Sequence, residues 1–408
     1  MFFNFASKST KDKSGLGKLK DVDLNFTDLP ESIDPNLVTS NESMPFAKDA
    51  FSALKNLLTA LAAENSALRD EVIINFNSSE DYQAFLDGVG DRKIKLLGNS
   101  DKFNSVRVGF DNFGDLFSEL SLMDPESYDM ETNFLVSLPG QPGIGNSPGA
   151  GDNAVAVGRD SLSVIGINDD NSDYGQGIKI AVIDSGIQEH ETFSGKQIKE
   201  YDFVSDNNGN SLPTDPDNGH GTAVASIIGG ADARNPGIAP ASELLSFRVL
   251  DNDGYTDSYT LAEAIVAATD AGADIINVSL GSKGDSGLVR RAVDYSISQG
   301  ALIVAATGNE GVGSISYPAA IDGVVAVAAN DAVGQHVDFA NSGRNLENGG
   351  MSAPGFAVVA AWPEDEMISF SGTSASAPFV SGAVACRGLS FPATRAARAS
   401  AHALARAR

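Results

Sequence analysis

The sequence predicts an α/β protein. We expect a doubly wound, mainly parallel sheet with helices on both faces, preceded by a small α+β domain of the ferredoxin-like type. Two observations lead to this prediction. From about residue 160 onward, short apolar strand patterns alternate with helical patterns, as in parallel sheets with helical crossovers. Residues 70–138 instead follow a β-α-β-β-α-β order, which is typical of small split βαβ domains.

The first 69 residues are predicted to be a flexible and partly helical N-terminal region. Residues 1–45 are polar, mixed in charge and without periodicity. From Asp49 to Leu68, apolar side chains recur at helical spacing, which predicts an amphipathic helix. The opening residues Met1–Lys8 do not contain the basic and apolar portions of a secretory signal, so no such signal is predicted.

The small α+β domain is predicted over residues 70–138. Its expected elements are strand Glu71–Phe76, helix Ser79–Gly88, strand Lys93–Gly98, strand Ser105–Phe110, helix Asn112–Leu122 and strand Asn133–Leu138. Residues 139–158 follow as a predicted linker. Its first part is rich in proline and glycine and can neither pack nor hold regular structure, so it is a natural place for proteolytic cleavage.

The larger α/β domain is predicted over residues 159–385. Near-continuous β-branched and apolar runs indicate strands buried on both faces of a parallel sheet. The expected strands are Lys179–Ile183, Glu243–Val249, Asp274–Ser279, Leu302–Ala306 and Val324–Ala328. The expected helices are His220–Ile228, Leu261–Ala271, Gly287–Ser298 and one that begins at Ser374.

Residues 386–408 form an atypical Ala/Arg-rich tail. This segment contains five arginines but no aspartate, glutamate or lysine, although the chain as a whole is strongly acidic. Two interpretations stay open. The tail is either foreign coding sequence, such as a frameshift or a chimeric end, or a natural basic amphipathic helix.

Bulk composition excludes some classes of partner. The net charge of −26 argues against nucleic acids and anionic membranes, since both require positive charge on the protein. No apolar run is long enough to span a bilayer. The single cysteine, Cys386, excludes an intramolecular disulfide and says little about the compartment.

Three short motifs contain an aspartate, a histidine and a serine, in that chain order. Asp184 ends a predicted buried strand, His220 opens a helix of small residues, and Ser374 opens another helix. A serine hydroxyl is a poor nucleophile unless a base takes its proton and a third group orients that base. A helix N-terminus also offers backbone N–H groups to developing negative charge. The three residues are therefore candidates for one nucleophilic site.

These motifs closely resemble those of the subtilisin-like serine proteases. The segments that carry the resemblance are Val182-Ile183-Asp184-Ser185-Gly186, Asn218-Gly219-His220-Gly221-Thr222 and Ser371-Gly372-Thr373-Ser374-Ala375-Ser376-Ala377-Pro378. The resemblance covers roughly residues 160–386 and implies a serine endopeptidase with Asp184, His220 and Ser374 as its triad. It also favours an extracellular location.

Further segments extend the resemblance. Asn309, within Gly308-Asn309-Glu310-Gly311, resembles the family's side-chain donor to the oxyanion. Ser279-Leu280-Gly281 resembles the strand that pairs with the substrate backbone, and Gly254 resembles the opposite wall of that cleft. Family members commonly carry a small N-terminal propeptide, so residues 70–138 are expected to be an inhibitory propeptide. The expected partners are protein or peptide substrates and this propeptide.

Other interpretations of the sequence compete with this one. His190, His336 and His402 are rival bases, but none lies in a comparable motif. No cofactor is required for the chemistry and no catalytic metal is predicted. Structural calcium stays open, because relatives bind it and the acidic segments Asn168–Asp173 and Asp202–Asp217 offer oxygen ligands. Two alternative functions also remain: a truncated chain that only binds, and a transamidase that uses the same triad.

Overall fold

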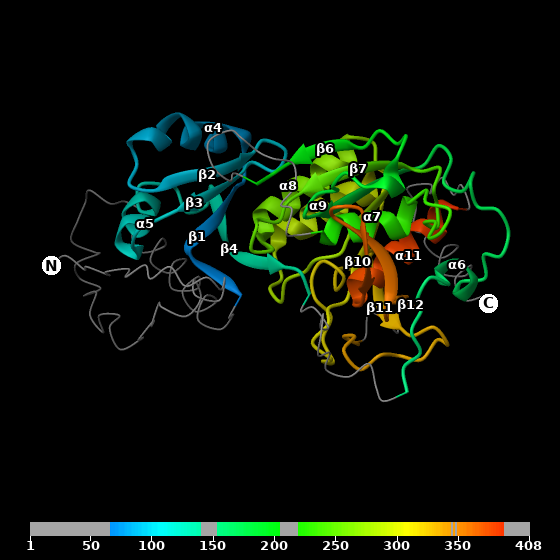
Figure 1. Ribbon diagram of the computed structural model, residues 1–408. Coiled ribbons are helices and arrows are strands. Elements are labelled where there is room, and N and C mark those ends of the chain that lie inside the picture. The colour runs from blue at the N-terminus through cyan, green and yellow to red at the C-terminus, as the bar shows by residue number, and fades with distance from the viewer. Residues whose placement is uncertain (1–65, 140–152, 205–218, 344–345, 347–348, 387–408) are drawn as a thin grey trace. The chain divides into compact units, whose positions relative to one another are not determined.

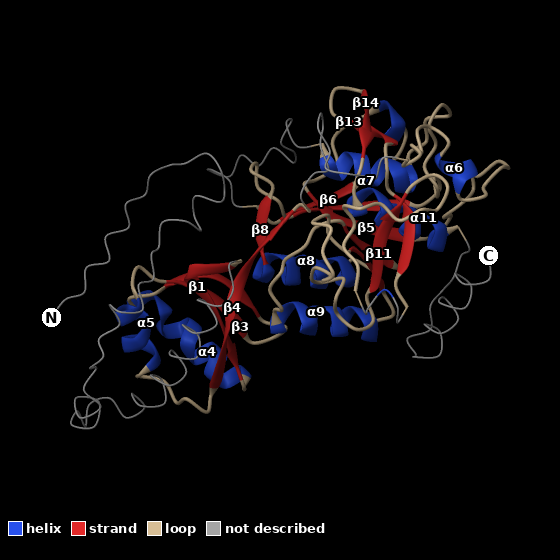
Figure 2. Cartoon of the chain, turned by 90° about the horizontal axis from the view of Figure 1, so that it is seen from below, coloured by secondary structure: helices blue, strands red, loops and turns tan. Residues whose placement is uncertain are grey.

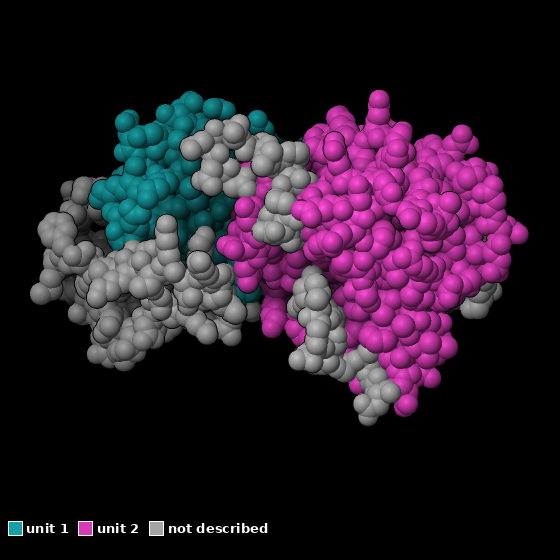
Figure 3. All heavy atoms as spheres, viewed as in Figure 1, with its two compact units in different colours: residues 1–135, 286–288 teal, residues 136–285, 289–408 magenta. Residues whose placement is uncertain are grey.

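The computed structural model describes residues 66–139, 153–204, 219–343, 346 and 349–386 (Figure 1). The chain divides into two compact units, which are coloured separately in Figure 3. The first unit comprises Met1–Leu135 and Ser286–Leu288, and the second comprises Val136–Asp285 and Val289–Arg408. In the described part of the chain, no helix has both the length and the apolar character needed to cross a membrane.

The first unit is a small antiparallel sheet with two helices, in the predicted β-α-β-β-α-β order. Its elements are β1 (Ala67–Phe76), α4 (Ser79–Gly88), the 3-10 turn η2 (Val89–Asp91), β2 (Lys95–Ser100), β3 (Ser105–Gly109), α5 (Phe113–Leu120) and β4 (Tyr128–Ser137). The strands lie in the order β2-β3-β1-β4, and each neighbouring pair is antiparallel. Alternate residues of β1, such as Val72 and Ile74, share one buried core with Phe85 of α4 and Leu116 of α5. The predicted small α+β domain is thereby confirmed.

Helix caps explain why the two helices of this unit begin where they do. Ser78 precedes α4 and its side chain accepts a hydrogen bond from the backbone N–H of Asp81. Asn112 precedes α5 and accepts in the same way from the N–H of Asp115. The side chain of Glu131, on β4, accepts hydrogen bonds from Asn75 and from the N–H of Leu288, which accounts for the inclusion of Ser286–Leu288 in this unit.

Two sequence predictions in this region need correction. The helix predicted over Asp49–Leu68 lies mostly outside the described residues, but its last two residues belong to β1, because Ala67 pairs with Phe134 of β4. The strand predicted over Asn133–Leu138 begins earlier, at Tyr128, which pairs with Phe76 at the end of β1. Its polar first half concealed the strand, since Asp129 and Glu131 do not resemble a buried run.

The second unit contains a seven-stranded sheet in the order β12-β11-β10-β9-β5-β7-β6, and every neighbouring pair is parallel. The strands are β5 (Lys179–Asp184), β6 (Lys199–Asp202), β7 (Glu243–Arg248), β9 (Ile275–Val278), β10 (Leu302–Ala306), β11 (Val325–Asn330) and β12 (Met351–Pro354). The predicted doubly wound parallel sheet is therefore confirmed. Its two edge strands, β6 and β12, were not predicted because they are short and partly exposed.

Helices cover both faces of this sheet. The main ones are α7 (His220–Gly229), α8 (Ser258–Asp270), α9 (Gly287–Ser298) and α11 (Thr373–Ala385). Ile180 and Val182 of β5 share a core with residues of α7 and α11, such as Val224 and Phe379. Figure 2 shows α8 and α9 on the opposite side of the sheet from α7. The smaller elements of this unit are α6 (Ser161–Val164), the 3-10 turn η3 (Glu191–Phe193), β8 (Tyr255–Asp257), β13 (Val358–Trp362) and β14 (Glu366–Phe370).

Candidate active site

Asp184 and His220 form a buried pair where β5 ends and α7 begins. The Nδ1 atom of His220 lies 2.8 Å from Oδ1 and 3.0 Å from Oδ2 of Asp184. The two side chains are only 1% and 0% exposed, so this contact is shielded from water. A buried carboxylate in this position fixes the orientation of the imidazole ring. The ring of Phe370, from β14, packs edge-on against the imidazole with centroids 5.2 Å apart.

The close approach of α7 to the end of β5 depends on Gly221. A Cβ atom at this position would lie 2.2 Å from the carbonyl oxygen of Gly186, a separation that no side chain can adopt. The backbone N–H of Gly221 donates to Ser185 Oγ at 3.0 Å, so the residue after the histidine is bound to the residue after the aspartate. The sequence motifs around Asp184 and His220 therefore specify how closely the two segments approach, in addition to which side chains they carry.

Ser374 is the second residue of α11, immediately after a turn that requires glycine. Gly372 precedes the helix with φ of 139°, in the region that L side chains rarely adopt. The hydroxyl of Ser374 donates to the carbonyl oxygen of Ser279 at 3.1 Å, and the hydroxyl of Ser279 donates to the carbonyl of Ser374 at 3.2 Å. Ser279 follows directly after β9, so these reciprocal bonds join the start of α11 to the C-terminal end of the sheet.

Asn309 lies beside the start of the same helix. Its Oδ1 atom accepts hydrogen bonds from the backbone N–H of Thr373 at 2.8 Å and from Thr373 Oγ1 at 2.9 Å. These contacts orient the amide so that its Nδ2 group lies on the side of Gly372, where a Cβ atom would be 2.9 Å from it. Thr373 was not singled out from the sequence. Its position between Gly372 and Ser374 in the motif was the only available signal.

The two predicted walls of the cleft flank a short extended segment of the chain itself. The N–H of Ser137 donates to the carbonyl of Gly281 at 3.0 Å, and the N–H of Gly281 donates back to Ser137 at 2.9 Å, in an antiparallel bridge. The N–H of Leu138 donates to the carbonyl of Gly254 at 3.4 Å. All these residues belong to the second unit. Ser279-Leu280-Gly281 and Gly254 are thus disposed to hold an extended peptide between them.

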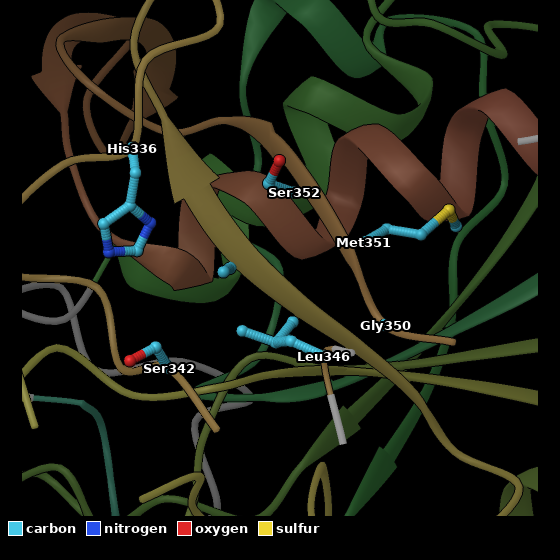
Figure 4. Close-up of a pocket in the computed structure, with 7 residues that line it drawn as sticks. His336, Ser342, Leu346, Gly350, Met351 and Ser352 are labelled. Carbon is cyan, nitrogen blue, oxygen red and sulfur yellow. The ribbon is translucent and has the colours of Figure 1, made fainter. Parts of the chain in front are cut away.

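The rival histidines lie in different surroundings. Both ring nitrogens of His190 contact main-chain groups. Its Nε2 lies 3.0 Å from the carbonyl of Glu366, and its Nδ1 accepts from the N–H of Thr192 at 3.0 Å. His336 is exposed and lines a separate pocket of about 430 Å³ with Ala328, Ser342, Leu346, Gly350, Met351 and Ser352 (Figure 4). None of the predicted site residues lines this pocket. His402 lies outside the described residues.

The described residues do not bring together three or more histidine, cysteine, aspartate or glutamate side chains that could hold a metal ion. In the acidic segment Asn168–Asp173, the amide of Asn171 donates to the carbonyl of Gly237 at 2.7 Å, and Asp170 accepts from the N–H of Ser172. These polar groups hold the local chain instead of converging on one point. Most of Asp202–Asp217 lies outside the described residues. Structural calcium therefore stays a prediction, and no step of the chemistry depends on it.

Comparison with known proteins agrees with the resemblance of the sequence motifs. Residues 175–405 match the model of the subtilase family. Thermitase from Thermoactinomyces vulgaris is 38% identical over 213 residues, which is 51% of this chain and 74% of that protein. Subtilisin Savinase from Lederbergia lenta is 35% identical over 219 residues, or 52% of this chain and 76% of that protein. The crystal structure of fervidolysin from Fervidobacterium pennivorans, a keratinolytic enzyme related to subtilisin, has a TM-score of 0.62 at 22% identity and covers 79% of this chain and 55% of that chain.

Proposed function

Since the chain belongs to the subtilase family of serine proteases, we propose that it is a serine endopeptidase in which Asp184, His220 and Ser374 form the catalytic triad. The observation that carries the proposal is the buried contact of His220 with Asp184, at 2.8 Å, in the same unit as Ser374, which lies in the first turn of α11. Each of the three side chains is at most 2% exposed, so the charges that develop during reaction are poorly screened by water.

In the proposed reaction, Ser374 Oγ attacks the carbonyl carbon of a peptide bond while His220 Nε2 takes the hydroxyl proton. Asp184 holds the ring through Nδ1 and stabilises the imidazolium that results. The imidazolium then gives its proton to the departing amine, and an acyl-enzyme remains on Ser374. A water molecule, deprotonated by His220, attacks this ester and releases the acid. The serine regains its proton from the same imidazolium.

Asn309 is proposed to stabilise the oxyanion that forms in each half of the reaction. The Oδ1 atom is engaged by Thr373, which directs the Nδ2 donor toward the start of α11. The backbone N–H of Ser374, at the second position of that helix, supplies another donor and lies in the positive end of the helix dipole. Donors that are held in place before the reaction need little reorganisation when negative charge appears.

The substrate is proposed to bind as an extended strand between Gly254 and Ser279–Gly281. Residues Ser137 and Leu138 already occupy this position and use only main-chain hydrogen bonds to do so. Binding through the main chain gives affinity with little dependence on sequence, which suits an enzyme that acts on many proteins. The same observation supports the proposal that residues 70–138 are a propeptide whose end blocks the cleft until it is removed.

The function is tested by following the products of a peptide substrate by mass spectrometry. We expect wild-type protein to give two fragments whose summed mass exceeds that of the intact peptide by one water. Ser374→Ala should give no fragments. Addition of an amine nucleophile distinguishes the transamidase alternative, because amide products would then replace the free acid. Absence of any cleavage, after removal of the N-terminal unit, would support the alternative of a chain that only binds.

A further inference from the structure

His190 lies at the start of η3 and joins this short turn to the hairpin formed by β13 and β14. Its Nδ1 atom accepts the N–H of Thr192 at 3.0 Å, and its Nε2 atom lies 3.0 Å from the main-chain carbonyl of Glu366. A main-chain N–H can only donate and a carbonyl can only accept. The ring therefore carries its proton on Nε2 and donates it to Glu366, the first residue of β14. Because His190 is only 6% exposed, water competes little for either bond.

A second contact holds the turn of the same hairpin. Asp365, in that turn, accepts the main-chain N–H of Glu191 at 2.7 Å. Glu364 and Asp365 have φ of 64° and 58°, in the left-handed region that residues other than glycine seldom adopt. Backbone conformations of this kind persist where the surrounding contacts determine them. The start of η3 therefore fixes the hairpin at its turn, through the side chain of His190 and the N–H of Glu191.

The hairpin in turn contacts the start of α7. Phe370, the last residue of β14, packs edge-on against the ring of His220, with ring centroids 5.2 Å apart. Trp362, the last residue of β13, lies so close to Gly219 that a Cβ atom at this glycine would be 2.6 Å from the indole ring. Trp362 also pairs with Glu366 in the hairpin. The strand that η3 holds therefore carries one of these aromatic contacts and pairs with the residue that makes the other.

The turn that carries Ser374 has anchors of its own, although it follows β14 directly. The hydroxyl of Ser371 accepts the N–H of Ala357 at 2.9 Å, and the N–H of Gly372 donates to the carbonyl of Gly355 at 2.8 Å. These bonds hold the turn even where β14 shifts. A displacement of β14 would thus act chiefly on the imidazole ring that packs against its last residue.

We propose that His190 is a positioning residue for His220, and that it acts through β14 and the ring of Phe370. The proposal rests on the proposed endopeptidase function and adds to it a residue outside the triad. A displacement of about 1 Å at a reacting group can cost on the order of 10²-fold in rate, so partial release of β14 should lower kcat by about tenfold. KM should stay within about twofold of wild type, because the hairpin does not include the groove residues Gly254 and Ser279–Gly281.

The test measures kcat and KM of purified full-length proteins on a peptide substrate. His190→Asn keeps an acceptor for the N–H of Thr192 but is too short to reach Glu366, so it should show the loss of about tenfold in kcat. His190→Gln keeps a donor near the position of Nε2 and should retain at least about half of the wild-type kcat. Asn171→Ala is the matched control. It removes another buried side-chain donor to a main-chain carbonyl, that of Gly237 at 2.7 Å, and should leave kcat unchanged.

A double-mutant cycle with Phe370→Leu tests the route of the effect. Phe370→Leu removes the ring that contacts His220. His190→Asn should therefore cost less than about twofold in kcat when it is added to Phe370→Leu, because the two substitutions interrupt the same path. Equal losses from His190→Asn in the wild-type and Phe370→Leu backgrounds would show that His190 does not act through Phe370, and would overturn the proposal.

Fluorescence gives a measurement that does not depend on activity. Trp362 is the only tryptophan of the chain, and its emission is recorded in a Ser374→Ala background. His190→Asn should shift the emission to longer wavelength as the indole becomes more exposed, whereas His190→Gln and Asn171→Ala should not. An unchanged spectrum in His190→Asn would overturn the proposal, as would a loss of kcat in Asn171→Ala equal to that in His190→Asn. If wild-type protein hydrolyses no peptide, the proposed function fails; if His190→Asn hydrolyses peptide with the wild-type kcat, only this inference fails.

Discussion

The side chain of Asn309 is held at its Oδ1 end, while its proposed role as an oxyanion donor belongs to its Nδ2 end. Thr373 donates two hydrogen bonds to its Oδ1 atom, one from the main chain and one from the hydroxyl. A primary amide held in this way cannot rotate without breaking both bonds. Its Nδ2 group is therefore placed before the substrate arrives, which is the condition for effective stabilisation of an oxyanion.

Replacement of Asn309 by alanine should lower kcat by about 10²–10³ and leave KM nearly unchanged, because the donor acts mainly on the transition state. Steady-state kinetics on a peptide substrate measures both constants. Asn309→Asp is the matched comparison, since it keeps the acceptor for Thr373 but replaces the donor with a negatively charged oxygen. It should be at least as impaired as the alanine variant. A loss below about fivefold in Asn309→Ala would show that this amide is not the donor.

Tyr128, the first residue of β4, gives the first unit a sensitivity to alkaline pH. Burial raises the pKa of its phenol from 10.0 to about 12. A raised pKa in the folded state means that this residue favours folding fully below pH 10, and that the contribution is lost as the pH rises toward 12. Tyr128→Phe removes the ionisable group, so its free energy of unfolding should fall less than that of wild type between pH 10 and 12.

This expectation is measured by denaturant unfolding at several pH values, in a Ser374→Ala background that prevents self-cleavage. Tyr255→Phe, at a half-buried tyrosine of β8, serves as the control substitution. If Tyr128→Phe and wild type lose stability in parallel over this range, ionisation of Tyr128 does not contribute to alkaline unfolding.

At the scale of secondary structure, the site depends on how closely α7 approaches the end of β5. The helix starts at His220, and its second residue lies against the carbonyl of Gly186 with no room for a side chain. The parallel sheet brings the ends of β5 and β9 together as direct neighbours, and Ser279 follows β9. The helices α7 and α11 pack against each other, so the segments that carry His220 and Ser374 belong to one rigid core.

Gly221→Ala should reduce activity by about 10²-fold, because the added methyl group would push the start of α7 away from Gly186 and lengthen the contact between His220 and Asp184. Gly229→Ala is a suitable control in the same helix. Its Cβ atom would meet only side-chain atoms of Leu244 and Ser242, at 3.2–3.4 Å. Activity and the thermal midpoint are measured for both. If Gly221→Ala retains the activity of Gly229→Ala, the proposed alignment by close approach is wrong.

At the scale of the whole molecule, the sequence predicted a small α+β sheet followed by a larger parallel sheet with helices on both faces, and the structure has both. The prediction succeeded where the local pattern agreed with the final environment, as in the fully apolar β10 and the small-residue helix α7. It failed where tertiary pairing decides the structure. The polar start of β4 is a strand because it pairs with β1. The edge strands β6 and β12 are too short to show a pattern.

The geometry around the candidate site was predictable only in part. Motifs identified Asp184, His220, Ser374 and Asn309, because unusual combinations of glycine and small residues surround them. They could not reveal that Ser279 accepts the hydroxyl of Ser374, or that Ser137 pairs with Gly281. Those relations depend on which segments meet in space and on the register of an antiparallel pair. A short stretch of sequence determines neither of them.

The central claim is that Ser374 is an activated nucleophile that depends on His220 and Asp184. A fluorophosphonate probe tests it most directly, because such probes form adducts only with activated serines. Labelling is measured by intact mass and peptide mapping on wild type, Ser374→Ala and Asp184→Asn, after removal of the N-terminal unit. We predict one adduct, located on Ser374, that is absent from Ser374→Ala and forms much more slowly in Asp184→Asn. Equal labelling of Ser374→Ala, or no labelling in a preparation that cleaves peptides, would contradict the assignment.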